Sequence, residues 1–309
     1  MLFRRIRQRH RLHPLSREMR WLRILVVLVV FAGAGISGGV LVGFLSAQGP
    51  VAALERYDPP QVTRLFDRSG RIRVADFYSE KRHVLALSDM PSALRGAFIA
   101  IEDERFYEHF GTDPQGILRA LLRNLQAGQL REGGSTITQQ MTRNVLPQIS
   151  TDRTLKRKIR EALMSLQIES HYSKDQILEF YLNQIFLGHG AYGVQAAAQT
   201  YFGKSAIDLN IAECASLAAI PKAPTQTNPF SSPEKLVARR NLVIEKMREQ
   251  GRISEEQAEE ALNTPLQTVR SSRPRVRFPY FVDHLRRNLS SDAEIGEDLA
   301  SRGGYRIFS

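Results

Sequence analysis

The sequence predicts a mainly α-helical domain with a small β-hairpin, preceded by a single transmembrane helix. Three observations support this prediction: an uncharged apolar stretch near the N-terminus, a short alternating stretch after it, and helical spacing of apolar residues from Pro91 onward. The 309 residues, 42% of them hydrophobic, are enough for an anchor and one sizeable domain. The single cysteine, Cys214, excludes an internal disulfide framework.

The N-terminus is strongly basic. Residues 1–23 hold eight arginines and one acid, Glu18, and so carry seven of the eleven net positive charges. Residues 24–47 follow without a charge and are long enough, at about 1.5 Å per residue, to cross a bilayer. This order predicts a cytoplasmic tail and an extracytoplasmic domain; a cleaved signal peptide, whose apolar region usually has about 7 to 15 residues, is the alternative. Because the excess charge lies in the tail, we expect a membrane contact and no nucleic-acid partner.

The rest of the chain divides into a juxtamembrane segment, a helical domain and a linker. Residues 48–90 alternate apolar and polar residues around positions 67–70, which predicts the β-hairpin. Residues 91–265 predict the helical domain, and residues 266–309, which begin with serine, proline and arginine, predict a linker. The predicted helices cover residues 91–108, 113–127, 135–145, 152–171, 174–185, 190–200, 208–219, 233–250 and 254–262.

Helix-start signals support several of these boundaries. Pro114 stands early in its helix, where the missing N–H costs nothing. The patterns S-K-D-Q from Ser173 and S-E-E-Q from Ser254 predict capping boxes, in which the first and fourth residues satisfy each other's backbone amides.

The segment "EDERFYEHFG", residues 102–111, combines acids, aromatic rings and a histidine behind an apolar run. On a helix that continues to residue 108, Glu102, Phe106 and His109 lie on one face. We expect a carboxylate, a ring and an imidazole to act together there. The alternative is a helix end whose acidic side chains are simply solvated.

A second polar block, "EGGSTITQQMTRN", covers residues 132–144. Its hydroxyl and amide side chains are costly to bury without partners. Backbone amides freed by the glycines, together with Ser135, Thr136, Gln139 and Gln140, predict a grip on a sugar or a phosphate.

A basic stripe follows at helical spacing and ends at Glu161. A solvated helix face is the usual meaning of such a stripe, but beside a membrane it also suits anionic headgroups. The members of the stripe are Arg153, Lys156, Arg157 and Arg160.

Residues 177–205 then run from an amphipathic helix through a glycine-rich loop into a helix of small residues, for which close packing is the simpler interpretation.

Together these blocks resemble the signature motifs of the peptidoglycan glycosyltransferases, the bacterial enzymes that polymerise lipid II. The match runs through "EDERFYEHFG", "GGSTITQQ", "RKIRE", "ILEFYLNQIFLGHGAYGVQAAAQTYFGK" and "ECASLAAIPKAPTQTNP", over residues 91–229. The basic tail, apolar stretch and hairpin resemble the N-terminal part of a bifunctional class A penicillin-binding protein. We expect the transpeptidase domain to be absent, since no S-D-N or K-T-G motif is present.

The resemblance implies a lysozyme-like fold and a mechanism for the site. Lipid II carries undecaprenyl diphosphate, already a good leaving group, so no general acid is needed. Glu102 is implied as the base that deprotonates the acceptor 4-hydroxyl, with inversion to a β-1,4 link. Glu161 is implied to organise the diphosphate together with Arg143, Arg157, Lys158 and a Mg²⁺ or Mn²⁺ ion.

Further contacts with lipid II or the growing glycan strand are implied for other residues of the motifs. Asp103 points away from Glu102 on a helix and is expected to brace the backbone as well. Arg143 departs from the family pattern, which has lysine there. The further residues are Asp103, Phe106, His109, Gly134, Ser135, Thr136, Gln139, Gln140, Asn144 and Asn183.

The implied location is the bacterial inner membrane, with a single pass and a cytoplasmic N-terminus, and other cell wall synthesis proteins are implied as partners. Two other functional classes stay open. A lysozyme-like enzyme that cleaves glycans would need a carboxylic acid with a raised pKa beside the scissile bond, and would not need a basic stripe. A non-catalytic membrane-anchored scaffold would bind lipid II without turning it over.

Overall fold

The computed structural model describes residues 63–77, 81–128, 133–145, 154–269, 278–292 and 304–309, and a few isolated positions besides. The chain forms two compact units, residues 1–47 and residues 48–309. The predicted membrane helix at residues 24–47 lies almost wholly outside the described residues, so it stays a prediction. Among the residues that are described, none of the helices is long and apolar enough to span a bilayer.

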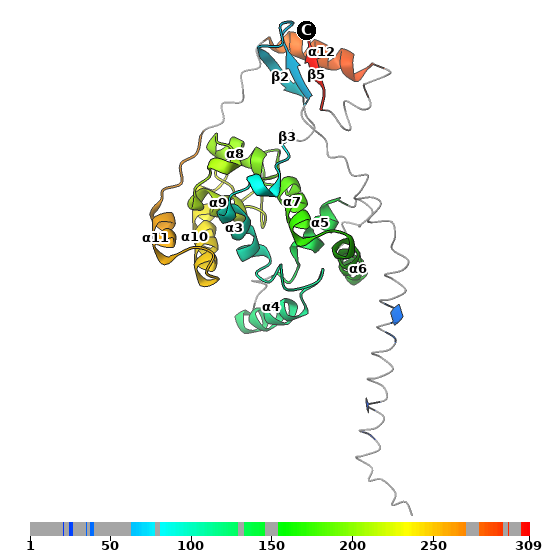
Figure 1. The fold of residues 1–309 in the computed structure, drawn as a ribbon, viewed down its shortest axis with the longest axis vertical. Coiled ribbons are helices and arrows are strands. Elements are labelled where there is room, and N and C mark those ends of the chain that lie inside the picture. Colours follow the sequence, from blue (N-terminus) through cyan, green and yellow to red (C-terminus); the bar gives the residue numbers. More distant parts are fainter. Residues whose placement is uncertain are drawn as a thin grey trace, which may run out of the picture. The chain divides into compact units, whose positions relative to one another are not determined.

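The second unit is mainly helical, as predicted, with short strands before and after the helices (Figure 1). Two single 3-10 turns, η1 (Leu87–Asp89) and η2 (Ala206–Asp208), link longer elements. The helices are α3 (Ser92–Glu102), α4 (Pro114–Ala127), α5 (Ile137–Val145), α6 (Leu155–His171), α7 (Lys174–Gln184), α8 (Val194–Phe202), α9 (Ile211–Ala219), α10 (Pro233–Glu249), α11 (Glu255–Asn263) and α12 (Pro279–Ser290).

The core forms around α3, which packs against both α9 and α10 (Figure 1). The sequence of α3 is apolar over most of its length, and Leu94 and Phe98 are fully buried. Small residues of α9 let the helices approach closely, and Cys214 is buried there as a small apolar group. Burying one leucine or phenylalanine side chain stabilises the fold by about 1.5 to 3 kcal/mol, so this packing holds the end of α3 firmly.

The end of α3 differs from the prediction. The helix stops at Glu102 instead of residue 108, and Asp103 leaves it with φ −159° and ψ 75°. Here the Asp103 carboxylate accepts a hydrogen bond from the backbone amide of Ile137, far along the chain, and lies 3.0 Å from His109 Nε2, contacts that a continued helix does not provide. Glu102, Phe106 and His109 therefore do not share a helical face, and the expectation based on that face was wrong.

The predicted helix starts agree well with the structure. Both capping boxes are present, at Ser173 of α7 and at Ser254 of α11, and Pro114 is the first residue of α4. A third box between Asn210 and Glu213 begins α9 and was not anticipated.

The predicted hairpin is present as β1 (Thr63–Phe66) and β2 (Arg73–Phe77), which pair antiparallel. Asp67 in the turn accepts hydrogen bonds from the backbone amides of Arg71 and Ile72. Strand β5 (Arg306–Phe308) joins β1 in parallel, and α12 lies against β2 (Figure 1). Residues 266–309, which we expected to be a linker, thus contain a helix and a strand. A three-residue strand and an isolated helix leave only a weak pattern in the sequence, so neither was predicted. A second small sheet pairs β3 (Lys81–Arg82) with β4 (Ala191–Tyr192).

Candidate active site

Glu102, the last residue of α3, is half-buried. Burial raises its pKa above the ordinary value, because a buried carboxylate loses the hydration that favours its charged form. A hydrogen bond from Gln140 Nε2 to Oε2, 2.8 Å long, opposes the shift, as do the positive charges of Arg239 and Arg143; Asp103 adds to it. The net direction is upward, which makes Glu102 a better proton acceptor than an exposed glutamate.

A hydrogen bond from Tyr181 orients the Gln140 side chain. The hydroxyl of Tyr181 donates to Gln140 Oε1 at 3.3 Å, so that the amide nitrogen faces Glu102. Tyr181 is fully buried, and burial raises its pKa well above the ordinary value. It therefore stays protonated and keeps its role as a donor.

Glu161 lies in a different setting, on α6 between two cations. Its carboxylate is fully buried, with Arg157 Nε 3.6 Å from Oε1 and Lys158 Nζ 3.4 Å from Oε2. Within the described part of the chain, Oε1 has no hydrogen-bond partner. Lys158 Nζ also donates to Ser135 Oγ at 2.6 Å and to Gln139 Oε1 at 2.9 Å. Burial lowers the pKa of Lys158, although Glu161 opposes this.

Helix α5 joins the two carboxylates. Gln139 serves the Lys158 group and its neighbour Gln140 serves Glu102, which is possible because successive side chains on a helix point about 100° apart. One turn later the exposed Arg143 lowers the pKa of both Glu102 and Lys158 by its charge. The predicted base, the predicted diphosphate group and the "GGSTITQQ" block thus meet around α5.

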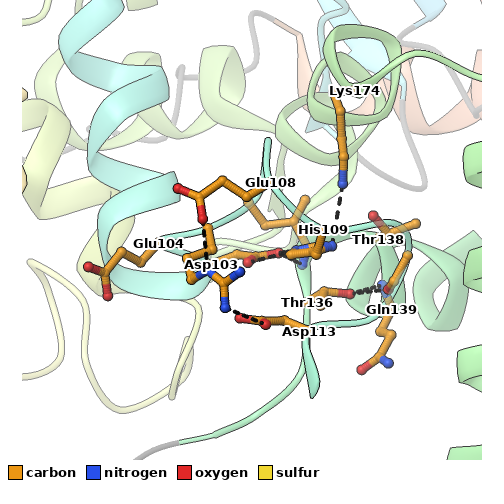
Figure 2. Close-up of polar contacts among 12 residues, drawn as sticks. Asp103, Glu104, Glu108, His109, Asp113, Thr136, Thr138, Gln139 and Lys174 are labelled. Carbon is orange, nitrogen blue, oxygen red and sulfur yellow. Dashed lines mark hydrogen bonds and ion pairs between the residues drawn. The ribbon is translucent and has the colours of Figure 1, made fainter. Parts of the chain in front are cut away.

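The loop after α3 is tied to the start of α5 (Figure 2). His109 Nε2 lies 3.0 Å from both carboxylate oxygens of Asp103, which also accepts the Ile137 amide at 2.9 Å. Thr136 Oγ1 donates to the Gly111 carbonyl and accepts the Gln139 amide. Gly111 has φ 71°, and a Cβ there would lie 2.8 Å from the backbone of α6, so this close approach requires glycine.

Some predicted substrate contacts have internal partners instead. Phe106 is fully buried in the core, and the Asn183 side chain is engaged by the backbone of Leu85 and by the Glu179 carbonyl. Both side chains are therefore engaged inside the chain, and their contacts with substrate stay predictions. Asp103, Thr136 and Gln139 are also buried and bonded within the chain.

The other predicted contacts are not tested by this geometry. Gly134 lies against α4, where a Cβ would approach Ile117 at 3.2 Å, and Asn144 is exposed near the end of α5. Their contacts with substrate, and that of Ser135, stay predictions.

The sequence analysis missed two residues beside Glu102. Arg239 of α10 donates from Nε to the Ala219 carbonyl, and its charge favours ionised Glu102. Tyr181 acts through Gln140. Arg239 is followed by Arg240, and this charged pair in a helix with apolar spacing was the only signal; nothing in the sequence linked it to α3.

Residues 70–248, more than half of the chain, match the family model described as Transglycosylase. The chain belongs to this family.

The individual relatives are penicillin-binding proteins. The chain is 44% identical over 256 residues to penicillin-binding protein 1A of Aquifex aeolicus, covering 83% of this chain and 34% of the relative. It is 39% identical to penicillin-binding protein 1A of Escherichia coli, covering 94% and 34%. A crystal structure of penicillin-binding protein 1A from Haemophilus influenzae, 26% identical, gives a TM-score of 0.48 and covers 82% of this chain and 27% of that one. The chain spans about a third of the length of these curated relatives.

Proposed function

We propose that the chain is a peptidoglycan glycosyltransferase that joins lipid II units into β-1,4-linked glycan strands during bacterial cell wall synthesis, on a lysozyme-like fold. Membership of the transglycosylase family supports the reaction class. The single observation that carries the mechanism is the position of Glu102, whose pKa is raised by burial and whose carboxylate is held by Gln140.

In this proposal Glu102 acts as the general base. Its carboxylate takes the proton of the acceptor 4-hydroxyl, and the oxygen attacks the anomeric carbon of the donor from the face opposite the diphosphate. The bond between that carbon and the phosphate oxygen breaks, the electron pair leaves with undecaprenyl diphosphate, and the configuration inverts. Base assistance of this kind contributes about 10² to 10⁴ in rate.

The cations around Glu161 are suited to the leaving group. Arg157 and Lys158 lie beside its carboxylate, and Arg143 is near enough to affect Lys158. Charge-assisted hydrogen bonds from such groups stabilise the negative charge that develops on a departing diphosphate. Glu161 holds these side chains in place.

The residues also fit a divalent cation. The Oε1 atom of Glu161 has no hydrogen-bond partner among the described residues, and a carboxylate oxygen is a suitable ligand for Mg²⁺ or Mn²⁺. The described residues contain no group of three acidic, histidine or cysteine side chains that could hold a metal ion, and Glu161 is the residue that would hold the ion in this proposal. When bound, the ion supplies positive charge to the leaving group.

The proposed location is the bacterial inner membrane, with residues 24–47 as a single-pass anchor and the catalytic unit outside the cytoplasm.

Helix α4 supports a second contact with the lipid, because its apolar side chains are 44% to 69% exposed and arginines accompany them. Other cell wall synthesis proteins as partners stay a prediction from the resemblance. The exposed apolar residues of α4 are Ile117, Leu118, Leu121, Leu122 and Leu125.

The contact of α4 with lipid is testable by fluorescence. In a Trp21→Phe background, which removes the only tryptophan, Leu125→Trp should be strongly quenched by lipids with brominated acyl chains. Glu259→Trp, at an exposed position of α11, serves as the matched control and should be quenched little. Equal quenching at the two positions would contradict the proposed contact of α4 with the membrane.

A lysozyme-like hydrolase is the second candidate, because a glutamate with a raised pKa also suits a general acid. Glu161 argues against it, since a carboxylate buried between two cations is poorly placed as the second group of a hydrolase. The test is incubation of the full chain in detergent with labelled lipid II and Mg²⁺, followed by gel separation. Glycan strands support transfer, fragments released from finished peptidoglycan support cleavage, and binding without products supports a scaffold.

A further inference from the structure

A second charged group lies at the start of α5, between the C-terminal end of α6 and the first residue of α7. Glu169 of α6 accepts hydrogen bonds through Oε1 from Lys174 Nζ at 2.7 Å and from Thr138 Oγ1. The Glu169 and Lys174 side chains are only 2% and 19% exposed, and the Lys174 ammonium also lies 4.5 Å from the centre of the Phe106 ring. The proposed chemistry of the site uses none of these three polar side chains, although burying an ion pair is costly.

Lys174 also reaches the loop after α3. Its Nζ lies 3.4 Å from His109 Nδ1, and Figure 2 shows Lys174 pointing toward His109 and His109 toward Asp103. An ammonium can only donate, so His109 Nδ1 must be the acceptor. The other ring nitrogen, Nε2, faces the Asp103 carboxylate.

These contacts form a closed ring. The ring runs from Glu169 through Lys174, His109 and Asp103 to the Ile137 amide, and returns from Thr138, the next residue, to Glu169. It encloses the first turn of α5 and fixes that turn to Asp103, the neighbour of Glu102. The same helix carries Gln140, one turn further on, whose amide holds the Glu102 carboxylate.

We propose that Lys174 is a positioning residue for Glu102: through the ring it holds α5 so that Gln140 meets the catalytic carboxylate. This inference rests on the proposed function of Glu102. Lys174 itself is placed to touch neither sugar nor diphosphate, since its partners are Glu169, His109 and Phe106.

The ring makes a consequence measurable at Glu102. The hydrogen bond from Gln140 is the largest influence that holds the pKa of Glu102 down against burial. If α5 loosens, this bond weakens and the pKa of Glu102 rises further. The other charged or titratable groups that act on Glu102 come from α5, α10, α7 and the adjacent residue, and they are Arg143, Arg239, Tyr181 and Asp103.

The test compares two lysines that each pair with a glutamate. Lys174→Met keeps the length of the side chain but cannot donate, and Lys204→Met breaks the Lys204–Glu213 pair, 2.8 Å long and outside the site. Turnover of lipid II by the full chain is measured against pH, and the Glu102 carboxyl is titrated by ¹³C NMR, with Glu102→Gln for assignment.

For Lys174→Met we expect a loss of about 10- to 100-fold in kcat, as for a group displaced by about 1 Å, with KM little changed. In this variant the pH midpoint on the acid side of the kcat profile and the midpoint of the Glu102 titration should both rise. In Lys204→Met both midpoints should stay unchanged.

An unchanged Glu102 midpoint in folded Lys174→Met protein would overturn the proposal, even if kcat fell. If that variant does not fold, Glu169→Gln decides, because it keeps the acceptor for Thr138 and Lys174 but removes the charge. Its midpoint should rise by less than expected for Lys174→Met, and no rise would overturn the proposal. If wild-type protein makes no glycan strands, the proposed function fails, yet the titration still decides the role of Lys174.

Discussion

Glu102 and Glu161 are the same residue type in one group of helices, yet their surroundings differ. The closest partner of Glu102 is a neutral amide, and its cations act without a direct ion pair. Glu161 is fully buried with Arg157 and Lys158 within 4 Å. Desolvation therefore raises the pKa of the first carboxylate, whereas the second lies between two cations. The comparison supports the proposed division of roles, in which one carboxylate accepts a proton and the other organises positive charge.

The largest effect that sharpens this comparison is expected for Glu102→Gln. Glutamine keeps the shape of the side chain but cannot accept a proton, so turnover should fall by about 10² to 10⁴. Binding of lipid II should be largely retained, because the cations that hold the diphosphate remain. The measurement is the initial rate of glycan-strand formation beside a direct binding assay.

Glu104→Gln is the matched control for this variant, because the Glu104 side chain is 41% exposed and forms an ion pair with Arg119 at the surface. Asp103→Asn is a poorer control, since Asp103 braces α5. Comparable losses for Glu102→Gln and Glu104→Gln in folded protein would remove the special role of Glu102.

A smaller loss is expected for Glu161→Gln. The neutral amide leaves Arg157 and Lys158 without their counter-charge and weakens the proposed metal ligand. The apparent affinity for Mg²⁺ should fall at least about 10-fold, and added Mg²⁺ should restore part of the rate. An Mg²⁺ titration of turnover checks this, and an unchanged metal response at wild-type rate would exclude Glu161 from the site.

The smallest effect concerns stability and its sign. Because the pKa of Glu102 is higher in the folded chain than its ordinary value, the stability linked to its proton is fully present in acid and is lost as pH rises through the folded pKa. At neutral pH the buried Glu102 carboxylate is ionised, which lowers the free energy of unfolding. Glu102→Gln removes this buried charge and should raise the melting temperature, by about 2 to 4 °C for each kcal/mol gained. The difference should vanish toward acid pH in melting curves recorded in detergent; a variant less stable than wild type at neutral pH would contradict the raised pKa.

The sequence predicted the elements with strong local signals and missed those that depend on distant partners. Both capping boxes and the hairpin turn follow from residues within five positions of each other, and they were correct. The end of α3 was wrong because Ile137, far along the chain, supplies the amide that Asp103 accepts.

The candidate site shows the same division. The motifs predicted Glu102 and Glu161 as site residues, whereas Arg239 comes near Glu102 through the packing of α10 on α3, which no motif showed. Phe106 was assigned to the site because helical spacing placed it beside Glu102. The helix ends before it, and an apolar ring is more stable in the core than in water.

The division of roles between the two carboxylates is tested most directly by the pH dependence of kcat for wild type and Glu161→Gln, at saturating lipid II and Mg²⁺. The account predicts that kcat falls in acid with a midpoint above the ordinary glutamate value of 4.5, because protonated Glu102 cannot act as a base. It also predicts that this midpoint stays in place in Glu161→Gln, since the main influences on the pKa of Glu102 are burial, Gln140, Arg239, Asp103 and Arg143. A midpoint that moves or disappears in Glu161→Gln would show that Glu161 titrates as the base, and would contradict the account.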